Sequence, residues 1–451
     1  MAAPARVSAP ATETAAPVGE CPSSEERLSV EGVLPAGLDG CFLQAFPHPA
    51  GAGRSGRGSV LSGIRLGKGG AARYRAGTRA PGLTPLTPLT PLTPLTPLGP
   101  LGPVPEPASP VRPAGAATPE LPGHVTMARP VRDPSTGGWH TIAAYPGLGY
   151  AEHLAAGPDG VVSHAQPFAL DGAPLMHAVA LTGHHVVVFD LPVVYRHAAA
   201  LVGARPPYAW QPGRPARVGL LPREGAAEPR WFPVDPCYVF QAVNAYEEGD
   251  RVVLDAVWHS RAFDRAFDGA FDTGPVTAFV PPPGGAPAAA AEPPHLRRWT
   301  FEPATGAVRE RPLLLARETA LIDERAGGRE HRHVFGSRED ATGTVLVHDD
   351  LLTGGGQEYG LGAGWRAGRP VFVPRPVPGA PDGRHGAEGD GWIVVFTHDA
   401  AHRCGALLVF DALDLAGGPY ATVHVPDSPP PSSRTAWLPA GEDTGPFARL
   451  P

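Results

Sequence analysis

The apolar residues of this chain fall mainly in short runs that are separated by turn-forming residues. The clearest run, Val186 to Leu191, reads VVVFDL and ends at Pro192. Shorter runs of the same kind occupy Ser62 to Leu66 and Ala71 to Arg75. Val-rich runs of this length, closed by Gly, Pro, Asn or Asp, are typical of buried β-strands rather than helices. The pattern therefore predicts an all-β protein made of many short strands.

Turn signals occur between these runs. Asp133-Pro134 with Thr136-Gly137 predicts one turn, and Glu248-Gly249-Asp250 predicts another inside a strand pair. Asp, Pro and Gly favour turns because Asp bonds its own backbone, Pro fixes φ and Gly accepts a positive φ. Frequent turns of this kind fit a chain of antiparallel strands.

Two segments depart from the pattern of strands and turns. Residues 1–26 are rich in Ala and Pro and are predicted to be a disordered N-terminal segment. Residues 82–123 contain five Leu-Thr-Pro and two Leu-Gly-Pro repeats and a Pro/Ala-rich continuation. Proline at every third position removes ladder donors and favours an extended, solvated form. We expect one folded domain, 27–445, that this low-complexity segment interrupts.

Composition narrows the class of protein. The chain has 451 residues, of which 42% are hydrophobic and 18% charged, as in globular proteins. A net charge of −7 argues against a nucleic-acid or anionic-membrane surface. Four widely spaced cysteines without a CxxC pair favour free thiols in a reducing compartment. The sequence has no apolar run of about 18 residues, so we predict a cytoplasmic protein without a transmembrane segment.

Several segments resemble, in the same order, the motifs of the carotenoid cleavage oxygenases. Residues 175–194 (LMHAVALTGHHVVVFDLPVV) resemble the M-H-D-F-x-x-T-x-x-Y-V-V-F-x-D-L-P pattern of that family. Residues 231–257 contain CYVFQAVNAYEEGDRVVLD, which resembles C-x-x-F-H-x-x-N-A-Y-E-x-G-D-x-V-V-L-D. Residues 321–337 (LIDERAGGREHRHVFGS) match a third motif, and 125–145 a fourth. The resemblance covers residues 28–80 and 125–440.

This resemblance implies a fold and a chemistry. The implied fold is an all-β, seven-bladed β-propeller with a dome of loops on one face. Because 82–123 falls where the family has a blade's strands, one blade is expected to be incomplete. The family holds Fe(II) on the propeller axis with four histidines and activates O₂ to cleave a double bond of a carotenoid or related apolar polyene.

The residues that match the four ligand positions are Arg129, His177, Gln241 and Arg434, so only His177 keeps a family-type metal ligand. The family also has glutamates that hydrogen-bond the ligand histidines and fix their tautomers. Glu318 matches one of these second-shell glutamates, whereas Arg369 stands in place of another.

Arginine stays protonated in proteins and offers no lone pair to a metal. By Coulomb's law, each guanidinium about 5 Å from Fe(II) costs on the order of 6 kcal/mol at an effective dielectric near 20. We therefore predict that this chain does not form the family iron site.

Three alternatives stay open. The first is an error in the alignment, since a shifted register would bring His124, His140 or His185 to one of the ligand positions. A weaker metal site of another kind is a second, if the arginines turn away. A decayed gene copy without a constrained function is the third, and the lost blade sequence favours it.

Two classes of function follow. One is an oxygenase acting on a polyene, which the family resemblance supports and the ligand set opposes. The other is a non-catalytic protein that binds an apolar polyene, serves as a scaffold, or binds a carboxylate or phosphate through Arg129, Arg369 and Arg434. Arginine forks suit such anions because they donate two parallel hydrogen bonds.

Overall fold

The computed structural model describes 26–47, 59–67, 70–77, 126–146, 148–158, 162–197, 208–225, 227–262, 292–377, 385–399, 401–426, 428, 430–432 and 434–440. These residues form almost only antiparallel strands, which confirms the all-β prediction. Residues 1–25 and 82–123 lie outside this part of the chain, so the disordered segment, the interrupting segment and the single domain 27–445 stay predictions.

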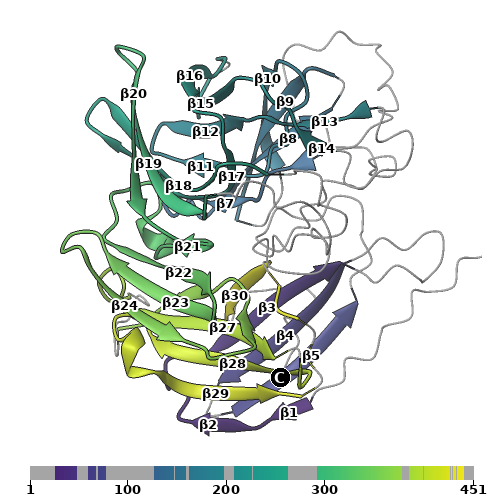
Figure 1. The fold of residues 1–451 in the computed structure, drawn as a ribbon, viewed down its shortest axis with the longest axis vertical. Helices are drawn as coiled ribbons and strands as arrows, with labels where there is room; N and C mark the ends of the chain where they lie inside the picture. The colour runs from purple at the N-terminus through teal and green to yellow at the C-terminus, as the bar shows by residue number, and fades with distance from the viewer. Residues whose placement is uncertain are drawn as a thin grey trace, which may run out of the picture.

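Six sheets of four or more strands are present in the described residues, and they follow the chain around a centre (Figure 1). The first two come from the N-terminal half, and the first is completed by the last strand of the chain. The first sheet contains β1 (Glu26–Leu28), β5 (Gly70–Gly77), β4 (Ser59–Gly67), β3 (Gly40–Pro47) and β30 (Thr435–Pro439). The second contains β6 (Thr126–Met127), β7 (Val131–Arg132), β8 (Trp139–Tyr145), β9 (Tyr150–Ala156) and β10 (Val162–Ala169).

The third and fourth sheets form the middle of the chain. The third contains β11 (Ala180–Leu181), β12 (His185–Asp190), β15 (Ala216–Pro222) and β16 (Arg230–Val234), and a separate pair is formed by β13 (Val193–Tyr195) and β14 (Tyr208–Trp210). The fourth contains β17 (Tyr238–Glu248), β18 (Arg251–His259), β19 (His295–Glu302) and β20 (Ala307–Leu314).

The fifth and sixth sheets complete the series. The fifth contains β21 (Thr319–Leu321), β22 (His333–Asp340), β23 (Gly343–Asp350) and β24 (Gly355–Gly360), with the short helix η1 (Glu324–Ala326) before β22. The sixth contains β2 (Val30–Gly32), β29 (Pro419–Val425), β28 (Cys404–Asp411), β27 (Gly391–Asp399), β25 (Trp365–Ala367) and β26 (Val371–Pro374), with η2 (Leu415–Gly417) before β29.

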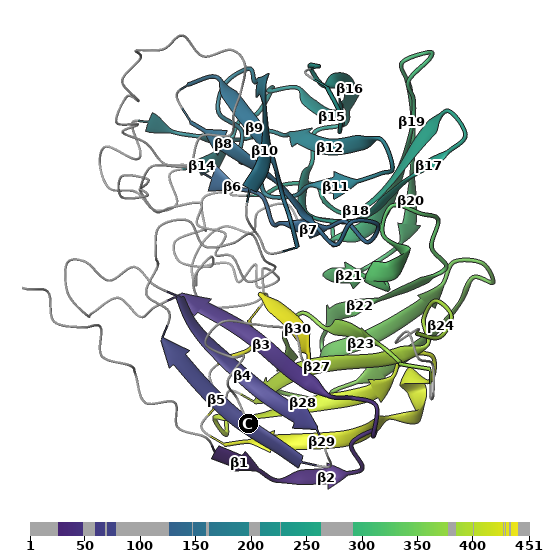
Figure 2. The same cartoon turned by 180° about the vertical axis from the view of Figure 1, so that it is seen from behind.

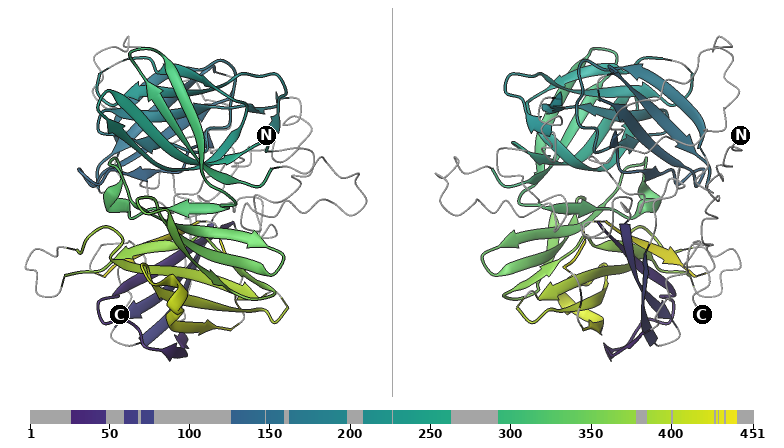
Figure 3. Two further views of the ribbon diagram at one scale, coloured as in Figure 1. Left: turned by 60° about the vertical axis from the view of Figure 1, so that its left-hand side comes forward. Right: turned by 90° about the vertical axis from the view of Figure 1, so that its right-hand side faces the viewer.

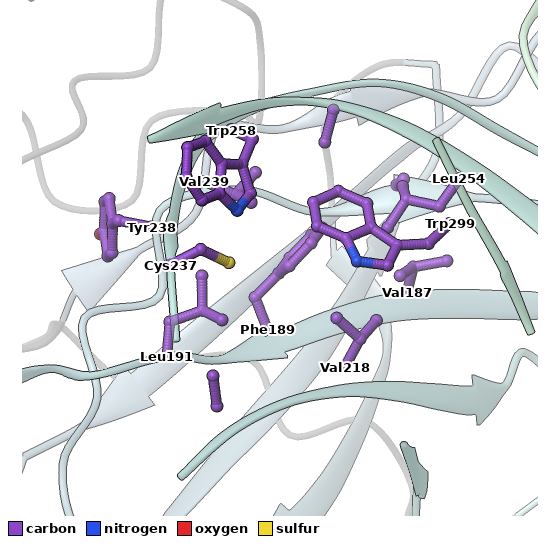
Figure 4. Close-up of a cluster of buried hydrophobic side chains, with 14 of the residues drawn as sticks. Val187, Phe189, Leu191, Val218, Cys237, Tyr238, Val239, Leu254, Trp258 and Trp299 are labelled. Atoms are coloured by element: carbon purple, nitrogen blue, oxygen red, sulfur yellow. The ribbon is translucent and has the colours of Figure 1, made fainter. Parts of the chain in front are cut away.

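The core lies between successive sheets, which explains the continuous apolar runs. In β12, Val186 and Val188 enter the cluster shared with the second sheet, while Val187 and Phe189 enter the cluster shared with the fourth. Figure 4 shows Phe189 next to Trp299 in the latter cluster. Side chains of a strand alternate between its two faces, so a strand covered on both sides needs apolar residues at every position.

Five such clusters join the second, third, fourth, fifth, sixth and first sheets in that order. β30 pairs with β3 of the first sheet, and β3 pairs with β4 on its other side, so strands from both ends of the described chain share one sheet (Figures 2 and 3). Residues 78–125 connect the first sheet to the second and lie outside the described part. The expected incomplete blade falls in this segment, so the number of seven blades stays a prediction.

The turns predicted from the sequence are confirmed. Gly249 has φ +59° and Gly137 has φ +72°, values that glycine adopts without strain. The Asp133 carboxylate accepts hydrogen bonds from the Ser135 backbone N–H (2.9 Å) and hydroxyl (2.6 Å). Within the described residues, no helix has the length and apolar character that crossing a bilayer requires.

Candidate functional site

Arg129 and His177 come from neighbouring sheets and are tied together through their backbones. Arg129 follows β6 and His177 precedes β11, and the Arg129 N–H donates to the His177 carbonyl oxygen (3.0 Å). This hydrogen bond holds the two positions side by side.

The His177 ring has a defined tautomer. Its Nδ1 lies 2.7 Å from the carbonyl oxygen of Phe240, at the beginning of β17. Because a carbonyl oxygen can only accept, Nδ1 carries the hydrogen of the neutral ring and Nε2 carries the lone pair. Burial, together with the charges of Arg434 and Arg129, lowers the pKa of His177 to about 4, although the Phe240 hydrogen bond opposes this shift. At neutral pH the imidazole is thus an uncharged acceptor.

Gln241 uses its side chain to connect two sheets. Its amide nitrogen donates to the Ala320 carbonyl oxygen of β21, and the Ala320 N–H donates to its amide oxygen (3.4 Å). Both ends of the amide therefore bind the backbone of the neighbouring strand. The Gln241 side chain therefore holds β17 against β21.

Arg369 and Arg434 come from segments that bind one another. The Arg369 N–H donates to the Ser432 carbonyl oxygen (3.4 Å), and the Arg369 carbonyl accepts from the Thr435 hydroxyl (3.0 Å). The Arg434 N–H donates to the Ser432 hydroxyl oxygen (3.0 Å). These bonds place both arginines where the sixth sheet meets β30 of the first.

The three guanidiniums share one electrostatic environment. Burial lowers the pKa of Arg129 well below its ordinary value, and the charges of Arg369 and Arg434 add to this effect, while Glu324 opposes it. Burial also lowers the pKa of Arg369, again opposed by Glu324. Like charges lower the pKa of a buried guanidinium only from nearby, so Arg369 and Arg434 lie in the surroundings of Arg129. The charge of Arg434 acts on both Arg129 and His177, and that of Arg369 acts on Arg129. We call these four residues the axial arginine site.

Glu318 lies directly before β21. Its N–H donates to the Ser337 carbonyl oxygen (2.9 Å), and burial, followed by the charge of Glu339, raises the pKa of its carboxyl group to about 7. Among the described residues, no hydrogen bond joins this carboxyl group to a histidine. The second-shell role implied by the family therefore stays a prediction.

Two residues of this region were not found from the sequence. Glu324, in η1, is the carboxylate that acts on both Arg129 and Arg369. His259 ends β18, its ring lies 4.9 Å from that of Phe240, and burial, with His295 and His177, lowers its pKa to about 4. Neither residue belongs to a ligand motif. Only the pairing of Tyr238 with His259 across β17 and β18 brings this histidine to the site.

The histidines that a shifted register requires are engaged elsewhere. The Nδ1 of His140 lies 2.9 Å from the Nε2 of His153, and the Nδ1 of His185 lies 3.1 Å from a carboxylate oxygen of Glu247. His124 lies outside the described residues. These contacts give no support to a shifted register in which His140 or His185 takes one of the ligand positions.

Fe(II), which the resemblance implies, does not fit this set of residues. Two of the four matched positions are guanidiniums, and the charges of both act on His177, the one histidine among the four. Within the described residues, no group of three or more His, Cys, Asp or Glu side chains is arranged to hold a metal ion. A four-histidine centre requires neutral donors with free lone pairs, which Arg129 and Arg434 lack.

Comparison with known proteins gives consistent results. The family model described as retinal pigment epithelial membrane protein matches residues 105–439. A carotenoid cleavage oxygenase of Mycobacterium tuberculosis is 31% identical over 366 residues, which cover 69% of this chain and 68% of that protein. Carotenoid 9,10(9',10')-cleavage dioxygenase 1 of Arabidopsis thaliana is 27% identical, and the match covers 68% of this chain and 56% of the plant protein.

Solved structures show the same fold. The lignostilbene dioxygenase of Pseudomonas brassicacearum superposes with a TM-score of 0.69 at 21% identity, covering 92% of this chain and 96% of that one. The cobalt-substituted Synechocystis ACO gives a TM-score of 0.69 at 20% identity, covering 93% and 97%. The predicted β-propeller is confirmed.

Proposed function

The chain belongs to the carotenoid oxygenase family, and on that premise we propose that it does not catalyse the family's iron-dependent cleavage of a polyene but binds an anion at its axial arginine site. The observation that carries this proposal is the cluster of Arg129, Arg369 and Arg434 around the neutral His177. Guanidiniums attract anions and repel cations, whereas a metal site must attract a cation.

The loss of iron chemistry follows from charge and from the missing donors. A divalent cation beside His177 meets two guanidiniums, each repelling it by several kcal/mol on the order estimated from Coulomb's law. Arginine cannot relieve this repulsion by losing its proton near neutral pH. His177 alone supplies one donor, and metal affinity depends on the number of ligands and on their supporting hydrogen bonds.

Anion binding follows from the same residues. The charges of Arg369 and Arg434 lower the pKa of Arg129, and a negative charge placed near these guanidiniums would stabilise their charged forms. Glu324 supplies one such charge to Arg129 and Arg369. The buried Nε of Arg369 has no hydrogen-bond partner, so a donor remains for a ligand. An oxyanion would accept from the guanidiniums through charge-assisted hydrogen bonds, which are stronger than neutral ones.

The test combines metal analysis with anion titration. The full chain, expressed with added Fe(II), is expected to contain iron far below one equivalent by elemental analysis. Sulfate and phosphate should each raise its melting temperature relative to chloride at equal ionic strength, by the linkage of binding to stability. Arg369→Met and Arg434→Met should remove most of this rise. Arg338→Met, which breaks surface pairs with Asp340 and Glu358, is the matched control.

Two results would overturn the proposal. Near-stoichiometric iron would restore the enzyme hypothesis, because the chain would then hold the metal through donors other than the four matched positions. Equal melting temperatures in sulfate, phosphate and chloride would remove the anion site. A cooperative unfolding transition of the purified chain would count against the decayed-copy alternative.

An apolar polyene is a second candidate ligand, as the names of the relatives suggest. The observation that favours it is a row of uncharged rings, in which Phe240 meets His177 edge-on at 5.4 Å and His259 at 4.9 Å. Quenching of tryptophan fluorescence by a carotenoid-derived aldehyde tests this candidate. Binding that Phe240→Ala weakens, without formation of a cleavage product in air with added Fe(II), is the expected result.

A further inference from the structure

A polar cavity of about 300 Å³ lies where the loop between β21 and β22 meets the segment that precedes β27. We call it the η1 cavity. Its volume is at the lower end of the range of small-molecule sites, which fits a molecule of metabolite size. A single apolar side chain, that of Ala326, is part of the lining, so a ligand has to be recognised by its charges. The lining residues are Asp323, Arg325, Ala326, Arg329, Glu330, Gly386 and Glu388.

Hydrogen bonds between the two segments fix the walls of the η1 cavity. The Arg325 guanidinium donates to the carbonyl oxygens of Gly386 (2.8 Å) and Ala387 (3.2 Å). The same guanidinium pairs with the Asp323 carboxylate at 2.9 Å and 2.5 Å. The second oxygen of that carboxylate also accepts from the Gly389 N–H (3.4 Å). All three guanidinium nitrogens and both carboxylate oxygens are thus engaged, and the two charges cancel.

Three charged groups of the lining remain available to a ligand. Glu388 accepts the backbone N–H groups of Arg332 (2.7 Å) and His333 (3.0 Å) with Oε1 alone. Within the described part of the chain, its Oε2 accepts no hydrogen bond, and the Glu330 carboxylate accepts none. Arg329 donates from one terminal nitrogen to a backbone carbonyl oxygen of η1, and its other two guanidinium nitrogens have no acceptor among the described residues.

These three groups define the chemistry of a complementary ligand. Glu330 and Glu388 only accept hydrogen bonds when ionised, and Arg329 only donates them. With the Asp323–Arg325 pair neutral, the η1 cavity carries one net negative charge. A matching ligand therefore has two cationic donor groups and one anionic acceptor group. An amino acid with a basic side chain has this set in its α-ammonium, its side-chain cation and its α-carboxylate.

We propose that the η1 cavity binds a free basic amino acid, with the α-carboxylate on Arg329 and the two cationic groups on Glu330 and Glu388. Arginine and carboxylate groups form parallel, charge-assisted hydrogen bonds. Glu388 is held in place by two backbone N–H groups, so its free oxygen binds with little further loss of side-chain entropy. The site is separate from the axial arginine site and does not rest on the function proposed there.

Titration calorimetry of the full chain at pH 7.5 tests the proposal with L-arginine, L-citrulline and Nα-acetyl-L-arginine. L-Citrulline keeps the size of L-arginine but has an uncharged side chain, and the acetyl compound lacks the α-ammonium. Arg329 and Glu330 are exposed, where ion pairs are weak, so a Kd on the order of 1 mM is expected for L-arginine. Each of the other two should bind at least about fivefold more weakly. Equal affinities for the three compounds, or no binding of L-arginine, would overturn the proposal.

Variants then assign the binding to the η1 cavity. Glu388→Gln keeps an oxygen that can accept the two backbone N–H groups, so the fold should be retained, and it should weaken L-arginine at least about fivefold. Arg329→Met should do the same. Arg338→Met, on the surface of the same sheet, is the control and should leave the affinity unchanged. Wild-type affinity in both cavity variants would refute the assignment. Sulfate should still raise the melting temperature of Glu388→Gln, so this site and the anion site fail independently.

Discussion

Two uncharged imidazoles hydrogen-bonded to each other in the interior should make this protein sensitive to acid. His140 in β8 and His153 in β9 are diagonal neighbours on adjacent strands, and the Nδ1 of His140 lies 2.9 Å from the Nε2 of His153. Their rings are stacked at 5.1 Å, with exposed fractions of 8% and 0%. Beside them, Arg223 forms an ion pair with Asp133.

The surroundings fix both tautomers. A guanidinium nitrogen of Arg223 lies 3.4 Å from the His140 Nε2. Because a guanidinium can only donate, the His140 Nε2 is the acceptor nitrogen of its ring. Its hydrogen is then on Nδ1, which donates to the His153 Nε2. Protonating His140 would put a second hydrogen against Arg223, and protonating the His153 Nε2 would abolish its acceptor. Both rings are stable only when they are neutral.

The pKa values give the magnitude of the effect. Burial, with the charge of Arg223, lowers the pKa of His140 from 6.5 to about 4, although Asp133 opposes the shift. Burial and His140 lower that of His153 to about 3. Above pH 6.5 neither the folded nor the unfolded protein binds these protons, so the two rings do not lower the free energy of unfolding. Below 6.5 the unfolded chain binds them first, and stability falls by about 1.4 kcal/mol per pH unit for each ring until its folded pKa is reached. At pH 5.0 the two rings together thus lower the free energy of unfolding by about 4 kcal/mol.

Urea unfolding at pH 7.5 and pH 5.0 measures this loss, provided that fluorescence and circular dichroism give coincident transitions. In the double variant His140→Gln with His153→Gln, the loss of unfolding free energy between the two pH values should be about 4 kcal/mol smaller than in the wild type. His402→Gln, at an exposed ring, is the control and should change the difference by less than about 1 kcal/mol. A double variant with the wild-type pH dependence would refute the reasoning.

Three further predictions follow from buried groups. Phe189→Ala should lower the free energy of unfolding by about 3–5 kcal/mol in urea titrations, because Phe189 is 2% exposed, whereas Leu352→Ala at a 75% exposed position should change it by less than about 0.5. Asp255→Asn should cost about 3–5 kcal/mol by the same measurement, since the fully buried carboxylate accepts from Arg298 at 2.7 Å and 2.6 Å. Burial raises the pKa of the Cys237 thiol to about 12, so peptide mapping after iodoacetamide treatment at pH 8 should find it unlabelled in the folded protein and labelled in urea.

The sequence predicted the parts of the fold that depend on local pattern. The run Val186 to Leu191 predicted a strand, and β12 occupies 185–190 with apolar residues facing two different sheets. The turn at Gly249 was predicted because glycine accepts its positive φ. The order of sheets around the axis came only from resemblance, since period-2 alternation fixes which face of a strand is buried but not which sheet covers it.

At the site, the family resemblance implied which positions converge, but it did not imply what their side chains contact. Arg129 and His177 are joined as expected because the backbone hydrogen bond between them does not depend on the side chain. Gln241 was expected only as a lost ligand, whereas its amide binds Ala320. Glu324 lies within the third matched segment, 321–337, but the resemblance gave it no role, and its influence on Arg129 and Arg369 appears only in the structure.

The region of the axial arginine site is held together without histidines at positions 129, 241 and 434. Two of the hydrogen bonds that position this region join backbone groups, Arg129 to His177 and Arg369 to Ser432, and a third runs from the His177 ring to the Phe240 carbonyl oxygen. None of them requires an imidazole at position 129, 241 or 434. A metal held by four side chains would add stability by linking four sheets, and here the Gln241 amide makes one such link between β17 and β21. At positions matched to the family's metal site, guanidiniums supply positive charge, which is the basis of the proposed preference for an oxyanion over a metal cation.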